Sequence, residues 1–264
     1  MRRRRLDEIF DFAALVLQKN LRLILTLSAP MIVVCFAANC WLIFWFARFG
    51  ADELEWLSWP HLALLFLLLF ERSLISLPVL LLNGNLLFER RPRLRGILGN
   101  ALRLYPRYLW SQAILAPLQI IVFSWTFVLP WRALVAHFFR GEVIALERLR
   151  GRDMTRRLDA MAAGQGERNV GFVILNALVF SLYLGAVAFG FNVVLGMASL
   201  SDHYWWLDAD ITLFSPVMHL FVLAYGVFHT TVKFLYYIDS RSLREGWDIE
   251  LTIVKGVRET EEAA

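Results

Sequence analysis

The chain has 264 residues, of which 58% are hydrophobic and 19% charged, and its formal net charge at pH 7 is +4. Soluble domains contain roughly 45–50% apolar residues, and a domain of this length cannot cover such an excess of apolar surface. Together with the mean hydropathy of +0.54, this composition excludes an ordinary soluble protein and predicts an all-α, polytopic membrane protein. The near balance of 27 basic and 23 acidic residues does not favour nucleic acid as a partner.

The chain begins with "MRRRR", but a secretory signal is not the favoured interpretation of this end. The apolar stretch starts only after Arg22 and continues to Ala47, which is much longer than the core of a signal peptide. Residues 6–20 carry apolar side chains at helical spacing among charged ones. This pattern predicts a helix lying on the membrane surface, followed by a first span at about residues 23–47.

Four more apolar runs have the length of about 20 residues that crosses a bilayer. They lie at about residues 59–83, 108–129, 170–198 and 213–237. Lys and Arg, which concentrate on the cytoplasmic side of membrane proteins, lie mainly between these runs. Of the 27 basic residues, 22 fall in segments 1–22, 84–107 and 148–169 and in the tail after Ile238.

The basic segments belong on one face of the membrane, so the chain must cross it an even number of times between 84–107 and 148–169. The single run at 108–129 cannot do this, and we predict a short polar sixth span at about 131–147. The alternative is a re-entrant hairpin over 108–147, which leaves four true spans. In either case residues 1–264 form one membrane domain with both termini cytoplasmic and with interfacial helices on that side.

Two formal charges, Glu71 and Arg72, lie at the centre of the apolar stretch 64–82. An ionisable residue at mid-bilayer costs roughly 2.5–3.5 kcal/mol on insertion scales, so it marks a candidate site. Successive helix residues point about 100° apart, so these two cannot simply pair and each must face another helix. We predict that they cluster with Arg140 and Glu142. Further ionisable residues in the predicted spans are Arg132, His137, His219, His229 and Lys233.

The predicted cluster has two interpretations. In the first, the charges neutralise one another in a dry core and fix helix packing, and this is the arrangement we expect at Glu71. In the second, they line a polar cavity and serve transport or catalysis.

Other parts of the sequence carry weaker signals. The P-loop, zinc-protease, serine-hydrolase and dinucleotide-binding patterns do not occur, and we predict neither a cofactor nor a metal. An outer loop has oxygen and imidazole groups that suit a divalent cation or a lipid enzyme, although outward topology alone also predicts such a loop. Those residues are Asp202, His203, Asp208 and Asp210. The segment "RRPRLRGILGNALRLYPR" predicts an interfacial helix that starts after Pro92 and contacts membrane lipids.

Three segments together resemble a group of uncharacterised bacterial multi-pass inner-membrane proteins. The tail "KFLYYIDSRSLREGWDIELTI" (233–253) resembles their closing aromatic run, Asp and Arg, and Glu-Gly-Trp-Asp stretch. The segments "RGEVIALERLRGRDMTRR" and "RLYPRYLW" are further, weaker matches. More distantly, the layout is similar to the membrane part of glycerophosphodiester phosphodiesterases. The resemblance implies an accessory protein that often accompanies MoxR-type ATPases and membrane transglutaminase-like proteins, and it carries over no catalytic residue.

The resulting functional hypothesis is a non-enzymatic inner-membrane subunit or scaffold of an envelope-associated complex. Its protein partners would dock on segment 148–169 and on the tail 239–254, with Arg241, Arg244, Trp247 and Asp248 as candidate contacts. In "DIELTIV" polar and apolar residues alternate, as they do in an added edge strand. The alternative is a small transporter or channel that uses the midplane charges around Glu71.

Overall fold

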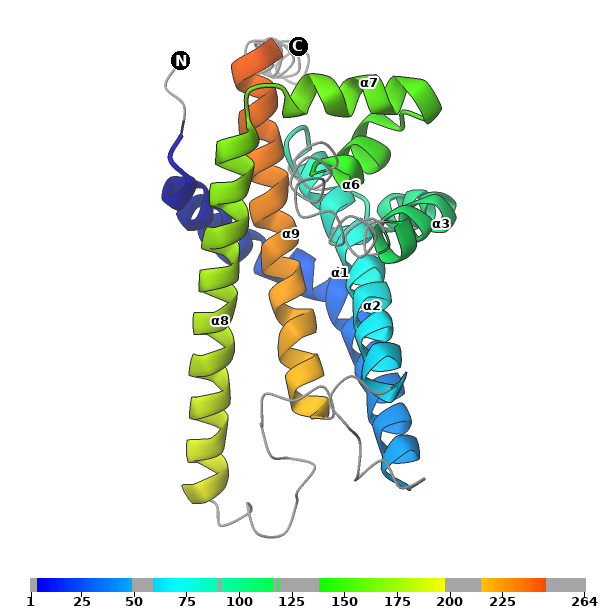
Figure 1. Ribbon diagram of the computed structural model, residues 1–264, viewed down its shortest axis with the longest axis vertical. Coiled ribbons are helices and arrows are strands. Elements are labelled where there is room, and N and C mark those ends of the chain that lie inside the picture. The colour runs from blue at the N-terminus through cyan, green and yellow to red at the C-terminus, as the bar shows by residue number, and fades with distance from the viewer. Residues whose placement is uncertain are drawn as a thin grey trace.

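The computed structural model describes residues 4–48, 59–89, 92–115, 118, 138–197 and 215–245. Within these ranges the secondary structure is helical, with no strand. Four of the described helices are long and apolar enough to cross a membrane, and most of their length extends along the long axis of the molecule (Figure 1). They are α1 (Leu6–Arg48), α2 (Trp59–Leu86), α8 (Gly166–Met197) and α9 (Pro216–Glu245). The prediction of an all-α, multi-pass membrane protein is confirmed at this level.

Helix α1 contains both the predicted surface helix and the predicted first span. Its backbone departs from helical geometry at Asn20, where φ is −111° and ψ is 17°, and the Asn20 side-chain amide donates a hydrogen bond to the Val16 carbonyl at 2.9 Å. The arm before Asn20 packs on two spans, because the Phe10 ring lies 5.7 Å from that of Phe172 and 6.1 Å from that of Phe228. The arm is therefore part of the core as well as of the surface.

Helix α9 is the most enclosed of the four candidate spans, and α8 is the least. Helices α1, α2 and α8 all pack on α9. Near its C-terminal end, the fully buried rings of Tyr236 and Tyr237 contact Phe139, and Tyr236 stacks on Phe172 at 4.8 Å between ring centroids. This aromatic core joins α9 to α8 and to the segment that precedes α6.

Shorter helices lie across the same end of the bundle. Helix α3 (Leu94–Leu109) begins just after Pro92, as predicted, and buries Ile97, Ala101 and Tyr108. It continues as the π-helix η2 (Trp110–Leu115). The chain is described again through α6 (Arg140–Glu142), the π-helix η3 (Val143–Glu147) and α7 (Gly151–Ala162). The predicted spans 108–129 and 131–147 are described only in part, because residues 116–117 and 119–137 lie outside the described residues.

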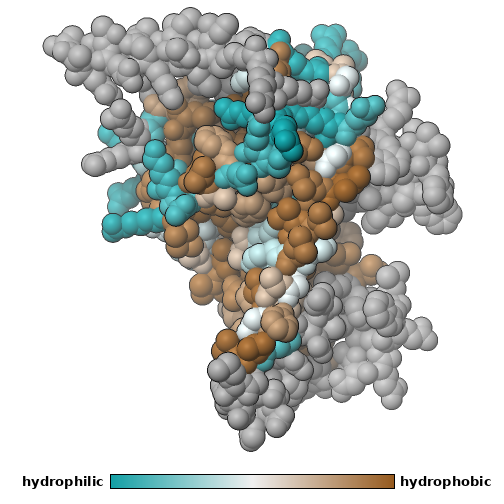
Figure 2. Space-filling view, turned by 90° about the vertical axis from the view of Figure 1, so that its left-hand side faces the viewer, coloured by the Kyte–Doolittle hydropathy of each residue, from teal (hydrophilic) through white to brown (hydrophobic). Residues whose placement is uncertain are grey.

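Polar residues are unevenly distributed over the described surface. On the face that Figure 2 shows, hydrophilic side chains gather toward the end of the molecule that carries α7 and the C-terminus of α9, and apolar ones predominate among the other coloured residues (Figures 1 and 2). Gly164, with φ of +69°, forms the turn between α7 and α8, a backbone conformation that favours glycine. This turn brings α7 across the bundle end, beside the last turns of α9.

Candidate functional site: a polar cavity beside Arg72

Glu71 and Arg72 lie near the middle of α2 and face different neighbours. The Glu71 side chain is buried and accepts a hydrogen bond from Asn39 Nδ2 of α1 at 2.7 Å. Arg72 faces α9 instead, and its Nη2 lies 2.8 Å from Nδ1 of His229. The prediction that these two charges do not pair with each other is confirmed. The partner of Glu71 is an amide of α1, which the sequence analysis did not propose.

A cavity of about 200 Å³ lies on the Arg72 side of α2. It is bounded by α2, α9, the junction of α3 with η2, and α6. Its lining residues are mostly polar: Leu69, Arg72, Ser73, Ser76, Tyr108, Gln112, Glu142, His229, Thr230 and Lys233. Of the predicted cluster, Arg72 and Glu142 line this cavity, while Glu71 and Arg140 are not among its lining residues. The cluster is therefore divided between two places, because α2 turns its adjacent charges toward different helices.

The acidic group of the cavity is paired with a base from α9. Glu142 is buried, and its Oε2 lies 3.2 Å from Nζ of Lys233. The Lys233 ammonium also lies 5.3 Å from the centre of the Phe138 ring, within the range of a cation–π contact. Glu142 and Lys233 thus compensate each other's charge at one wall of the cavity.

The remaining wall is built by close approach of backbone and polar side chains. The hydroxyls of Ser76 and Tyr108 lie 3.0 Å apart and share a hydrogen bond. A Cβ at Gly141 would lie 3.3 Å from both the Tyr108 hydroxyl and Nε2 of Gln112, which is tighter than ordinary contact. Glycine at this position therefore allows α6 to approach the end of α3.

The charge of the cavity does not balance. A guanidinium group only donates hydrogen bonds, so the His229 nitrogen that meets Arg72 is an acceptor and the imidazole is neutral. Within the described ranges, no carboxylate lies at ion-pair distance from Arg72. Since Glu142 and Lys233 cancel, the described lining carries one net positive charge.

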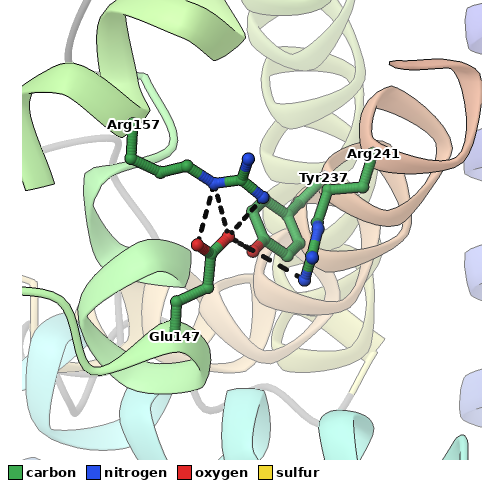
Figure 3. A network of polar contacts seen from close by, with 4 residues as sticks. All are labelled: Glu147, Arg157, Tyr237 and Arg241. Atoms are coloured by element: carbon green, nitrogen blue, oxygen red, sulfur yellow. Dashed lines mark hydrogen bonds and ion pairs between the residues drawn. The ribbon is translucent and has the colours of Figure 1, made fainter. Parts of the chain in front are cut away.

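A second polar assembly lies at the C-terminal end of α9 and is centred on Glu147 (Figure 3). The Glu147 carboxylate accepts hydrogen bonds from Arg157 Nε at 2.8 Å and Nη2 at 3.0 Å. It also accepts a hydrogen bond from the Tyr237 hydroxyl, and Nη1 of Arg241 lies at 3.8 Å. We call these four residues the Glu147 network; it joins η3, α7 and α9.

Further contacts hold α8 and α7 to the last turns of α9. Arg168 Nη2 lies 2.6 Å from Oδ2 of Asp239, and both side chains are buried. Arg244 donates hydrogen bonds to the carbonyls of Ala160 and Ala163 at the end of α7. The predicted docking residues Arg241 and Arg244 therefore have partners within the chain. Trp247 and Asp248, together with the "DIELTIV" segment, lie outside the described residues.

The metal hypothesis gains no support from the described part of the chain. No group of three or more potential ligands comes together there. The outer-loop residues Asp202, His203, Asp208 and Asp210 lie outside the described residues.

Sequence reasoning missed Asn39, Tyr108 and Gln112 as site residues. The only sequence signal for them is a polar side chain within an apolar run, because such groups bond to neighbouring helices. That signal does not identify the neighbour. The sequence also does not identify the neighbours of Glu147, so its network was missed. All four of its residues lie in the segments that carry the resemblance.

Comparisons with protein-family models, with curated proteins and with solved structures find no match to this chain. The resemblance of its tail to an inner-membrane family therefore stays a prediction. The interpretation of the site rests on the chemistry of its own residues.

Proposed function

We propose that the chain is a non-enzymatic subunit or scaffold of an envelope-associated complex in the bacterial inner membrane. The observation that carries this proposal is the fixed position of α7. The Glu147 network and Arg244 hold this helix across the end of the membrane body, while Arg152 and Arg156 are exposed on it. A rigid helix with outward basic side chains suits an acidic surface of a partner protein, because little ordering entropy is lost on binding.

The proposal includes a topology of six spans with both termini in the cytoplasm. It is supported by the positive-inside distribution of Lys and Arg, which places α7 on the cytoplasmic side. The partners implied by the resemblance, MoxR-type ATPases and membrane transglutaminase-like proteins, are the first candidates for the complex. Anionic lipids at the inner leaflet are the second class of contact.

Co-purification from native membranes tests the scaffold function. The full chain carries an affinity tag, and its partners are compared with those of the double variant Arg152→Glu, Arg156→Glu. We expect the variant to lose a partner that the full chain recovers reproducibly. A matched control reverses two exposed charges on α3, Arg95→Glu and Arg103→Glu. Recovery of identical partners by all three proteins would refute docking on α7.

The contribution of the tail requires a truncation that leaves the fold intact. Removal of residues 239–264 would delete Asp239, Arg241 and Arg244, which hold α7 and α8. Truncation after Glu245 keeps these contacts and removes only the segment with Trp247 and Asp248. We expect this shorter truncation to weaken partner recovery without changing the amount of protein in the membrane.

Cysteine labelling tests the topology. Ala160 is exposed on α7, so a cysteine at this position is accessible to reagents from one side. The background variant replaces Cys35 and Cys40, the two natural free thiols of the chain. We expect labelling of Ala160→Cys only after the membrane is permeabilised; labelling of intact cells would overturn the six-span topology.

A small transporter or channel is the second candidate function, and the cavity beside Arg72 favours it. Polar and charged side chains within a membrane-spanning region mark substrate or ion pathways. For this candidate function, we expect a small anion to flow into proteoliposomes that contain the full chain. We expect the variant Arg72→Gln to reduce this flux. Equal flux in protein-free liposomes would exclude it.

A further inference from the structure

We propose that the cavity between α2, α9 and α6 is a binding site for one monovalent oxyanion, held by the guanidinium group of Arg72. The chemical class is a carboxylate or a phosphodiester with a single negative charge. Such a group has two possible sources, a small soluble anion or the head group of an anionic lipid. The site goes beyond the proposed scaffold function, since a subunit can bind an anion whether or not it docks a partner.

The described lining of the cavity has an excess of one positive charge, which belongs to Arg72. Glu142 and Lys233 form an ion pair at 3.2 Å, so neither supplies a net charge. Arg72 has the neutral ring of His229 as its hydrogen-bonding partner. Arg72 is half-buried, and a cation withdrawn from water is normally paired with a carboxylate, yet the described part of the chain offers none within ion-pair distance. One bound monoanion would complete the charge balance.

The geometry of the hydrogen-bond donors in the cavity suits an oxyanion. The guanidinium is a planar fork that binds two oxygens of one carboxylate or phosphate group, which a halide cannot match. His229 accepts from Nη2 of Arg72 at 2.8 Å and thereby holds the fork in place, with other N–H groups left to donate. The amide of Gln112 lines the same cavity and donates to oxygen, so it can replace part of an oxyanion's hydration shell. The hydroxyl of Ser76 donates to the Ser73 carbonyl at 3.2 Å, and the Tyr108 hydroxyl donates to Ser76.

The size of the cavity is sufficient for a small oxyanion. Its volume of about 200 Å³ exceeds the share of liquid volume of a single water molecule, about 30 Å³. A volume of this size accommodates a carboxylate or phosphodiester group together with a few waters. A Cβ at Gly226 would lie 3.7 Å from Cγ of Arg72, which is ordinary van der Waals contact, so this part of α9 lies beside the stem of Arg72.

Thermal unfolding of the purified full chain tests the proposal, with the midpoint followed by tryptophan fluorescence. In the first arm, sodium acetate replaces sodium chloride at constant ionic strength in a nonionic detergent. In the second arm, nanodiscs of phosphatidylcholine are compared with nanodiscs that contain phosphatidylglycerol. We expect a saturable rise of the unfolding midpoint in at least one arm. A rise with acetate identifies a soluble source, and a rise with phosphatidylglycerol alone identifies the lipid.

Three variants separate the site from general salt effects. Arg72→Gln removes the charge, and we expect it to abolish the shift. Arg72→Lys keeps the charge but loses the fork, and we expect apparent affinity to fall about tenfold or more. Arg103→Gln removes an exposed guanidinium on α3 and should leave the shift unchanged. If Arg72→Gln does not fold, Arg72→Lys and Gln112→Leu are compared with the wild type instead.

Two results would overturn the proposal. One is the absence of any shift of the wild-type midpoint in both arms. The other is a shift of equal size and equal midpoint concentration in the wild type and in the Arg72 variants. Neither result depends on the scaffold function, because the assay contains no partner protein; conversely, loss of partner recovery by the α7 variants leaves the anion site intact.

Discussion

Replacement of Glu147 by glutamine should lower the stability of the membrane body more than replacement of any exposed acidic residue. Glu147 is the one carboxylate of its network, and it faces Arg157, Arg241 and the Tyr237 hydroxyl (Figure 3). Glutamine has nearly the same shape and keeps one oxygen acceptor. The change therefore removes the negative charge without opening a cavity.

The magnitude follows from the burial of the pair. Removal of one partner of a fully buried ion pair costs about 3–5 kcal/mol. The side chains of Arg157 and Glu147 retain 20% and 14% of their exposure, so water screens part of the interaction. With that screening, the expected loss is about 2–3 kcal/mol of unfolding free energy. Tyr237→Phe removes one hydrogen bond to the same carboxylate and should cost about 1 kcal/mol.

Reversible unfolding in mixed micelles of a nonionic detergent and dodecyl sulfate, followed by tryptophan fluorescence, measures these differences. The matched control is Asp7→Asn. Asp7 pairs with Arg5 at 3.0 Å, but the two side chains are 56% and 72% exposed, so its loss should cost at most about 0.5 kcal/mol. If Glu147→Gln costs no more than Asp7→Asn, the Glu147 network does not hold α7 to α9, and the reasoning fails.

Three further predictions use the same unfolding assay. Asn39→Leu removes the hydrogen bond to the buried Glu71 carboxylate and should cost about 2–4 kcal/mol; Glu71→Gln, which still accepts that bond, should cost much less. Burial raises the pKa of Tyr105 to about 12, so the folded state holds this proton more tightly than the unfolded chain, whose pKa is about 10. Its contribution to stability is therefore complete below about pH 10 and is lost as the pH rises toward 12, and Tyr105→Phe should flatten that alkaline loss. Arg244→Ala removes two hydrogen bonds to the last carbonyls of α7 and should cost about 1–2 kcal/mol and speed amide exchange in α7, whereas unchanged exchange would contradict the proposed anchoring.

The bounds of the long apolar helices could be predicted closely where apolar length alone defines them. The prediction of a span at 59–83 matches α2 (Trp59–Leu86), and that at 170–198 matches α8 (Gly166–Met197). The hydrocarbon core requires about 20 apolar residues in helical form, and this requirement is local in sequence. Helix α9 continues to Glu245, beyond the predicted end at residue 237. Its last turns are polar, and contacts to α7 and α8 satisfy their side chains.

The site could be predicted only in part, because helix rotation and helix partners are not local in sequence. The spacing of Glu71 and Arg72 correctly indicated that they face different helices. It contained no information on whether the partner of Glu71 would be an amide or an arginine. Likewise, the sequence identifies His229 as an ionisable residue in the last predicted span. Its hydrogen bond with Arg72, however, depends on how α9 packs on α2.

Within this chain, the residues of the tail around Tyr236 hold α9 to its neighbours. Tyr236 stacks in the aromatic core, Tyr237 bonds to Glu147, and Asp239 pairs with Arg168. Each of these residues fastens α9 to a neighbouring segment, and none requires a partner protein for its contacts. These residues therefore have a structural role in this chain whatever it binds. Docking is therefore tested by variants of the exposed residues of α7 and by removal of the segment after Glu245. These changes leave the contacts of Tyr236, Tyr237 and Asp239 intact.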